Sequence, residues 1–220
     1  MSPPVVMNLA LLVLGWALGI LSSPITDAIR RHSVKQRITR AIGTELRSLQ
    51  DAFAVVVIQV SGRRGALTHS LLEALMSTLM TSGHTVATSK ALKVIDERVS
   101  SGAGERPAPG DTERASRPVL LSLKVQGVPF LESHLHRMDF YAHETQRQLL
   151  EICAGSQIFN QVAEEAVHYQ FLAFSRGIDP ETMAALAASI EKCHEQAAEK
   201  ASELIAQIAV LLRNPEMQAH

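Results

Sequence analysis

The sequence has few of the residues and motifs that mark the common functional classes. Two cysteines among 220 residues exclude the dense pairing of a small secreted disulfide scaffold and suit buried, reduced thiols in a cytosol. Two tyrosines, one tryptophan and a net charge of -1 leave no surface suited to nucleic acid. A P-loop, Gly-x-Gly-x-x-Gly, Gly-x-Ser-x-Gly and Cys-x-x-Cys are all missing from the sequence. We therefore expect no nucleic-acid partner and no cofactor.

Charge is also missing from the longest apolar run. Residues 5–21, VVMNLALLVLGWALGIL, contain no charged side chain, and Asn8 is their one strongly polar residue. As a helix with a rise of about 1.5 Å per residue, the run spans about 26 Å, close to a thin hydrocarbon core. The preceding MSPP has no basic residue, which argues against a cleaved signal peptide. The sequence predicts a transmembrane helix over residues 5–23 after a short extracytoplasmic segment, residues 1–4.

Basic residues lie on one side of this run only. No Lys or Arg precedes it, and five follow it closely: Arg30, Arg31, Lys35, Arg37 and Arg40. The positive-inside rule then predicts a single-pass protein, N-out and C-in, with most of the chain cytoplasmic, as in a bacterial inner membrane. The cluster either determines topology alone or also binds anionic lipid head groups. Gly15 and Gly19 form a Gly-x-x-x-Gly that would let two such helices meet in a homo-oligomer.

The remaining sequence has helical periodicity. Ser23-Pro24 resembles the start of a new helix, and Ser61-Gly62 its end. The apolar positions between them recur every three or four residues: Ile38, Ile42, Leu46, Leu49, Phe53, Val56 and Val60. A second amphipathic helix, ending at Ser82-Gly83, carries Leu67, Leu71, Leu72, Leu75 and Leu79. With a shorter helix over Ser89 to Val99, these elements form a predicted helical hairpin region, residues 24–100.

A change of composition follows. Residues 101–117 are rich in Gly, Pro, Ser and charge, which predicts a flexible linker inside the bundle. Residues 118–214 form a predicted long-helix bundle region, and residues 215–220 a tail. Pro129 can open a helix to about Cys153, after which Gly155-Ser156 interrupts it. The pattern resumes and stops near Arg176-Gly177; the resumed apolar positions are Ile158, Val162, Ala166, Tyr169 and Leu172.

The last predicted helix has the clearest boundaries. Asp179-Pro180-Glu181 supplies an N-cap, a first-turn proline and a first-turn acid, and Asn214-Pro215 ends the helix. Its inner positions follow alternating steps of four and three: Met183, Ala187, Ile190, His194, Ala197, Ala201, Leu204, Ile208 and Leu211. His194 is the polar member of this heptad seam. It is predicted to fix register by pairing across the interface, and its titration would make packing depend on pH.

Acids and histidines at helical spacing suggest a metal site as an alternative. Steps of four, three and four would place four of them on one helical face: Glu132, His136, Asp139 and His143. Two further pairs have the Glu-x-x-His spacing of di-metal helical bundles: Glu165 with His168, and Glu191 with His194. Glu-x-x-His is a weak pattern because it consists of two residues only. A di-metal centre also requires glutamates from two further helices, and no residues of this sequence are convincing candidates for them. The main prediction includes no metal.

The sequence therefore predicts an all-α protein with one N-terminal transmembrane helix and a long-helix cytoplasmic bundle. Its predicted function is that of an interaction or scaffold protein without catalytic activity, with the bilayer and an unidentified protein as partners. Two alternatives stay open. One is a membrane-bound helical metalloenzyme that uses the candidates His136, His143, Glu165, His168, Glu191 and His194. The other is a membrane-acting effector that oligomerises through Gly15 and Gly19.

Overall fold

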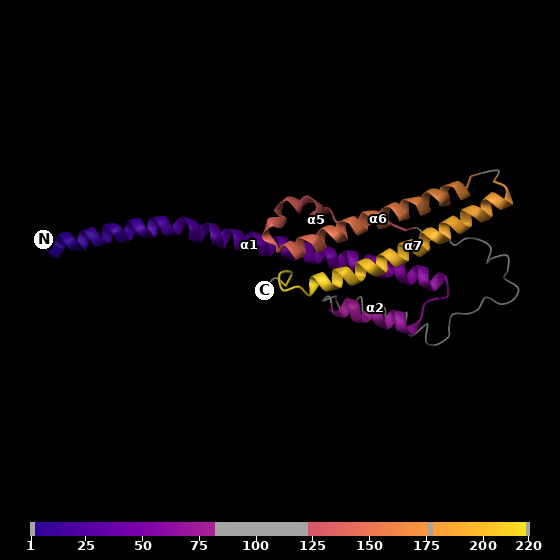
Figure 1. Cartoon of the computed structure of the whole chain (residues 1–220), viewed down its shortest axis with the longest axis horizontal. Helices are drawn as coiled ribbons and strands as arrows, with labels where there is room; N and C mark the ends of the chain where they lie inside the picture. Colours follow the sequence, from indigo (N-terminus) through magenta and orange to yellow (C-terminus); the bar gives the residue numbers. More distant parts are fainter. Residues whose placement is uncertain (1–2, 82–122, 176–177, 219–220) are drawn as a thin grey trace.

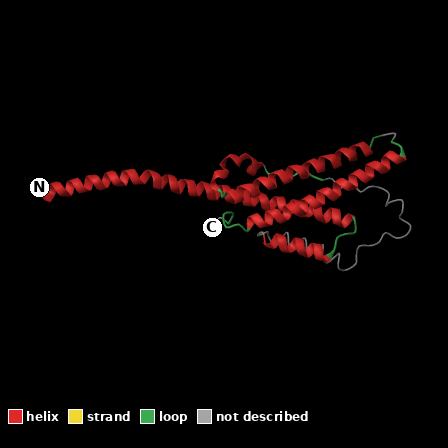
Figure 2. Cartoon of the chain, in the orientation of Figure 1, coloured by secondary structure: helices red, strands yellow, loops and turns green. Residues whose placement is uncertain are grey.

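The structure, a computed structural model, describes residues 3–81, 123–175 and 178–218, although most side chains of residues 3–25 are not described. Every regular element in these residues is helical, and they contain no strand (Figure 2). The all-α prediction is confirmed. The predicted helix over Ser89 to Val99 and the predicted linker, residues 101–117, lie outside the described residues.

Helix α1, Pro3–Arg63, is a single helix of 61 residues (Figure 1). The predicted boundary at Ser23-Pro24 is wrong, because α1 continues through both residues. A proline removes one backbone donor, but its φ near -65° is compatible with helix, so the loss is local. The N-terminal half of α1 projects from the bundle, and the C-terminal half lies within it. Among the described residues, no helix is both long enough and apolar enough to cross a membrane. For most of residues 5–23, the predicted transmembrane segment, the structure does not describe the side chains.

The C-terminal half of α1 supplies one side of the core. All seven residues of its predicted apolar stripe, from Ile38 to Val60, are buried. The β-branched run FAVVVIQV is helical, as its phase with the upstream stripe indicates. Phe53 meets Phe159 of α6, His143–Ala173, with ring centroids 4.9 Å apart and an edge-to-face angle of 68°. The ring contact joins two helices far apart in the sequence.

A tight turn leads from α1 into α2, His69–Thr81. Gly65 adopts a φ of +65°, in the left-handed region that glycine tolerates best. Leu72, Leu75 and Leu79 of α2 are buried. The second predicted helix is therefore confirmed within the described residues.

The single helix predicted from Pro129 to about Cys153 is wrong. The chain forms a short helix α5, Pro129–Ser133, then a 3-10 helix η1, Leu135–Phe140, and then begins α6. The carboxylate of Glu45 on α1 accepts hydrogen bonds from the backbone N–H groups of Phe130 and Leu131, each at 2.8 Å. These bonds hold the first turn of α5 against α1, and the chain bends at His134 before it reaches α6.

Helix α6 is continuous across Gly155-Ser156, so the predicted interruption is also wrong. Gly155 is buried, and a Cβ added there would lie 2.6 Å from Leu204 Cδ2 on the neighbouring helix α7, Pro180–Leu212. The glycine serves close packing between two long antiparallel helices rather than a break in one of them.

The predicted boundaries of α7 are confirmed. Asp179 is the N-cap and accepts a 2.9 Å hydrogen bond from the Thr182 N–H, and the helix ends two residues before Asn214. The heptad seam is buried from Ile190 to Leu211, but its first members, Met183 and Ala187, are exposed. The seam prediction is wrong for these two because α1 ends beside His194 and no third described helix covers the first turns of α7.

Both cysteines are free and buried, as predicted. Burial raises the pKa of Cys153 to about 11, and the charges of Glu132 and Glu45 add to the effect. Burial also raises the pKa of Cys193. Both side chains are therefore protonated thiols at neutral pH, and they act as small apolar groups in the core.

Candidate functional site

The most distinctive surface of the bundle is its base, where α1 leaves it (Figure 1). Four members of the predicted basic cluster are exposed there: Arg30, Arg31, Arg37 and Arg40. The buried stripe of α1 begins at Ile38, so Arg37 and Arg40 flank the point at which α1 enters the core, and Arg30 and Arg31 precede it by about two turns. We call these four residues the basic collar.

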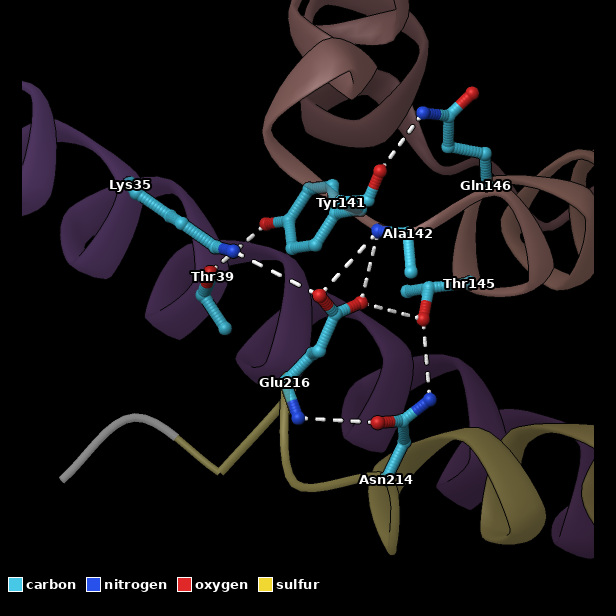
Figure 3. A network of polar contacts seen from close by, with 8 residues as sticks. All are labelled: Lys35, Thr39, Tyr141, Ala142, Thr145, Gln146, Asn214 and Glu216. Carbon is cyan, nitrogen blue, oxygen red and sulfur yellow. Dashed lines mark hydrogen bonds and ion pairs between the residues drawn. The ribbon is translucent and has the colours of Figure 1, made fainter.

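Lys35 differs from the rest of the cluster. Its side chain is partly buried, with Nζ 3.8 Å from Glu216 Oε1 and 5.4 Å from the centroid of the Tyr141 ring (Figure 3). The ammonium group is thus held by a carboxylate and an aromatic face. Lys35 belongs to the polar network beneath the collar, which we call the base junction; it comprises Lys35, Thr39, Tyr141, Ala142, Thr145, Gln146, Asn214 and Glu216.

Glu216 is the central acceptor of the base junction. Its carboxylate accepts hydrogen bonds from the Ala142 N–H at 3.0 Å and the Thr145 hydroxyl at 2.7 Å. Ala142 is the N-cap position of α6 and has no side-chain oxygen, so Glu216 takes over the capping of that helix. Asn214 positions this acid, because it accepts from the Glu216 N–H and donates to Thr145, each at 3.0 Å.

Tyr141 ties the start of α6 to α1. Its hydroxyl is 2.9 Å from Thr39 Oγ1 in a buried contact, and its carbonyl accepts from the Gln146 side chain at 2.8 Å. Burial raises the pKa of Tyr141, with the Thr39 hydrogen bond opposing this effect. The phenol stays protonated at neutral pH. The base junction therefore joins α1, the start of α6 and the segment after α7 in one hydrogen-bonded unit.

The carboxylate of Glu216 should make stability depend on pH. Partial burial alone would raise its pKa, but the Thr145 hydroxyl, the Ala142 N–H and the charge of Lys35 together lower it below 4.5. A lowered folded-state pKa stabilises the fold above the unfolded-state pKa, and this stabilisation is lost as pH falls through the folded value. We expect Glu216→Gln to lower the free energy of unfolding by about 1–3 kcal/mol at pH 7.

The test compares urea unfolding of wild type and Glu216→Gln at pH 7 and at pH 3, in detergent. The difference should shrink at the lower pH, where the wild-type carboxyl becomes protonated. Glu203→Gln is the matched control, since Glu203 is an exposed acid whose ion pair is with Lys200 on the same helix. An equal loss for Glu216→Gln at both pH values would contradict the charged capping role.

A second polar cluster lies where α1 ends. His194 is almost fully buried, and its Nδ1 is 3.5 Å from Arg63 Nη1. Arginine can only donate, so Nδ1 is the acceptor in this contact. Nearby, Arg64 Nη1 donates to Glu195 at 2.7 Å, and Arg64 Nε lies 3.9 Å from Glu191. His194 is thus in the seam, beside α1; its role in fixing register stays a prediction.

The structure separates the four residues proposed to share a metal-binding face. Glu132 is on α5, His136 and Asp139 are on η1, and His143 begins α6. The shared face is wrong because the chain bends at His134 and is extended at Tyr141 and Ala142. The other candidates are also dispersed: Glu165 and His168 are exposed on α6, and Glu191 faces Arg64. Within the described ranges, no three His, Cys, Asp or Glu residues are grouped to hold a metal ion.

Of the two glycines predicted to form a contact between transmembrane helices, the structure describes the surroundings of one. Gly15 is exposed, and no described atom lies within 4 Å of the position that a Cβ would take. The surroundings of Gly19 lie outside the described residues. The site residues that the sequence did not indicate are Glu45 and Glu216, two acids that cap helices distant in the sequence.

Comparison with known proteins identifies no relative. No family model, no curated protein and no solved structure matches the chain. The assignment of function therefore depends on the residues of this chain alone.

Proposed function

We propose that the protein is a single-pass, membrane-anchored scaffold that presents a helical bundle to a protein partner on the cytoplasmic side. The observation that carries the proposal is a charge-free run, residues 5–21, on the projecting half of α1. The basic collar follows it, and the bundle follows the collar. Residues 5–23 are the proposed transmembrane helix.

Exposure of the projecting helix supports the anchor. Leu12 and Trp16 are 71% and 69% exposed, and Met7 and Val13 are exposed as well. Apolar surface in water carries a free-energy cost of about 25 cal/mol per Å². A bilayer would remove this surface from water, whereas the described part of the bundle does not cover it. A helix that leaves the bundle without packing against it is what an anchor requires.

The charges on either side of the run support the orientation. The collar supplies four exposed arginines on the C-terminal side, whereas residues 1–4 contain no Lys or Arg. Each cation near an anionic leaflet contributes about 1 kcal/mol to binding. Lipid head groups are the proposed partners of the collar. The neighbouring base junction would hold the bundle in one orientation at the membrane surface, since it joins α1 to α6 and to the tail.

Self-association is a further part of the proposal. Gly15 has open space around it among the described atoms, so a second helix could approach the backbone closely there. Two anchored copies would then present two bundles side by side.

Topology reporters test the proposal. We expect a C-terminal fluorescent-protein fusion to be active in the cytoplasm and a C-terminal alkaline phosphatase fusion, which needs export, to be inactive. A matched inversion variant replaces the four collar arginines by Gln and places lysines at Pro3 and Pro4; it should exchange the two signals, because the excess of Lys and Arg then lies before the run. An active phosphatase on the wild-type C-terminus would overturn the orientation, and fluorescence that is fully soluble would overturn the anchor.

A further inference from the structure

The α6–α7 hairpin extends beyond the end of α1. Arg63, the last residue of α1, is beside His194, so the first eleven residues of α7, numbers 180–190, continue past it together with the end of α6. Figure 1 shows this end of the hairpin on the side of the bundle opposite the N-terminus. We call residues 164–175 and 178–190 the tip.

The tip exposes large apolar side chains. Val167 and Phe171 of α6 and Phe174, its C-cap residue, recur at steps of four and three, which places them on one helical face, and they are 45%, 74% and 68% exposed. Met183 of α7 is exposed as well. They are exposed because none of the described helices covers this face of the tip. An apolar face on a hairpin of two helices is suited to a third helix.

The charge at the tip restricts the chemistry of that third helix. Across residues 161–191 the acids are Glu164, Glu165, Asp179, Glu181 and Glu191, whereas Arg176 is the one Lys or Arg in this stretch of the sequence. Glu191 is paired with Arg64 and Asp179 caps α7 through Thr182, which leaves Glu164, Glu165 and Glu181 as exposed acids. An acidic surface repels an anionic bilayer and attracts a cationic partner.

The distribution of charge also disfavours a second copy of the chain. The exposed arginines of the collar are at the base, at the opposite end of the bundle. Two copies anchored in one membrane have their bases at the same level, so the collar of one cannot reach the tip of the other. Among the described residues, the collar is therefore excluded as the cationic partner of the tip.

We propose that the tip is a docking site for a basic amphipathic helix of another protein. Its apolar face covers Phe171 and Phe174, and its Lys or Arg residues lie against the acids that flank them. The inference deepens the proposed function by naming the kind of partner, and it rests on that function for its biological role. Binding at the tip itself does not require membrane insertion.

The probe is a synthetic 14-residue Leu/Lys helix, compared with a Leu/Glu helix of the same apolar pattern. Binding to the full chain in discs of uncharged phosphatidylcholine is measured by fluorescence anisotropy, with empty discs as the blank. We expect the Lys peptide to bind at least tenfold more tightly than the Glu peptide. The double variant F171S/F174S should weaken this binding at least tenfold, whereas the control V55S/V210S, at two exposed valines outside the tip, should not.

Three results of the peptide-binding assay would overturn the docking site. These are equal binding of the two peptides, equal loss in the tip and control variants, and no binding of either peptide to any variant. A wild-type dimer that F171S/F174S dissociates would overturn it in favour of a second copy. The charge variant E164Q/E165Q/E181Q should reduce the preference for Lys over Glu without removing the apolar face. If these measurements fail while the topology reporters show a cytoplasmic C-terminus, the docking site alone is rejected. If the chain is soluble and still binds the Lys peptide, the anchor alone is rejected.

Discussion

Replacing Phe159 by alanine is expected to lower the free energy of unfolding by about 3–5 kcal/mol, the range for truncation of a buried aromatic side chain. Phe159 is fully buried on α6, and its ring makes an edge-to-face contact with Phe53 of α1. Truncation removes this contact and leaves a cavity where the two helices meet. Since a domain is typically stable by about 5–15 kcal/mol, the variant would lose a large part of the total.

Phe171→Ala on the same helix is the matched control. The same side chain is removed there from a site that is 74% exposed, so we expect a change below about 0.5 kcal/mol. Urea unfolding in detergent, followed by far-UV circular dichroism, measures both variants. Similar destabilisation by the two substitutions would contradict the placement of α6 in the bundle.

The second large effect concerns the proposed anchor. We expect the double variant Leu12→Arg, Trp16→Arg to abolish retention in the membrane. Each arginine near the centre of a transmembrane helix costs about 2.5–3.5 kcal/mol, so two of them exceed what a 17-residue apolar run readily offsets. The measurement is the fraction of the chain that sediments with membranes after expression in cells.

Val55→Arg, Val210→Arg is the control for this variant. It adds the same two charges at valines exposed on the bundle, 51% and 58% accessible, and should leave the chain in the membrane fraction. If both double variants sediment like wild type, residues 5–21 are not what holds the chain at the membrane. If both are lost from the membrane fraction, added charge or misfolding accounts for the effect.

Local patterns predicted much of the fold. The stripe from Ile38 to Val60 and the N-cap at Asp179 depend on residues a few positions apart, so periodicity and capping chemistry suffice to place the C-terminal half of α1 and the whole of α7. The seam prediction failed at Met183 and Ala187 for a tertiary reason. Heptad spacing indicates which face of a helix is apolar, but the length of the neighbouring helix determines how far that face is covered.

The errors arise from long-range contacts. The chain bends after α5 because Glu45 binds that segment from 85 residues away, and no local pattern contains this partner. Gly155 predicts a break because glycine favours helix ends, but a close approach by Leu204 calls for the same residue. Glu216 lay in what the sequence predicted to be a plain tail. Its capping of α6 becomes visible only when the end of α7 is placed beside the start of α6.

The candidate site was predicted in part for the same reason. The basic collar follows from composition, since arginines gathered beside an apolar run are visible in the sequence alone. Lys35 was grouped with them, whereas the structure directs it to Glu216 and Tyr141. A charged side chain at the edge of a bundle can either face outward, as the collar arginines do, or pair with residues of the bundle, as Lys35 does. Only the tertiary structure distinguishes between these two environments.

Extraction of the wild-type chain from membranes with alkaline carbonate tests the central claim most directly. Carbonate at high pH strips proteins bound by charge alone, because it removes electrostatic attraction, and it leaves integral helices in the bilayer. The proposed anchor over residues 5–23 predicts that the chain stays in the membrane pellet after carbonate and enters solution only with detergent. Release of the full-length chain by carbonate would contradict the anchor and leave the collar as a peripheral contact.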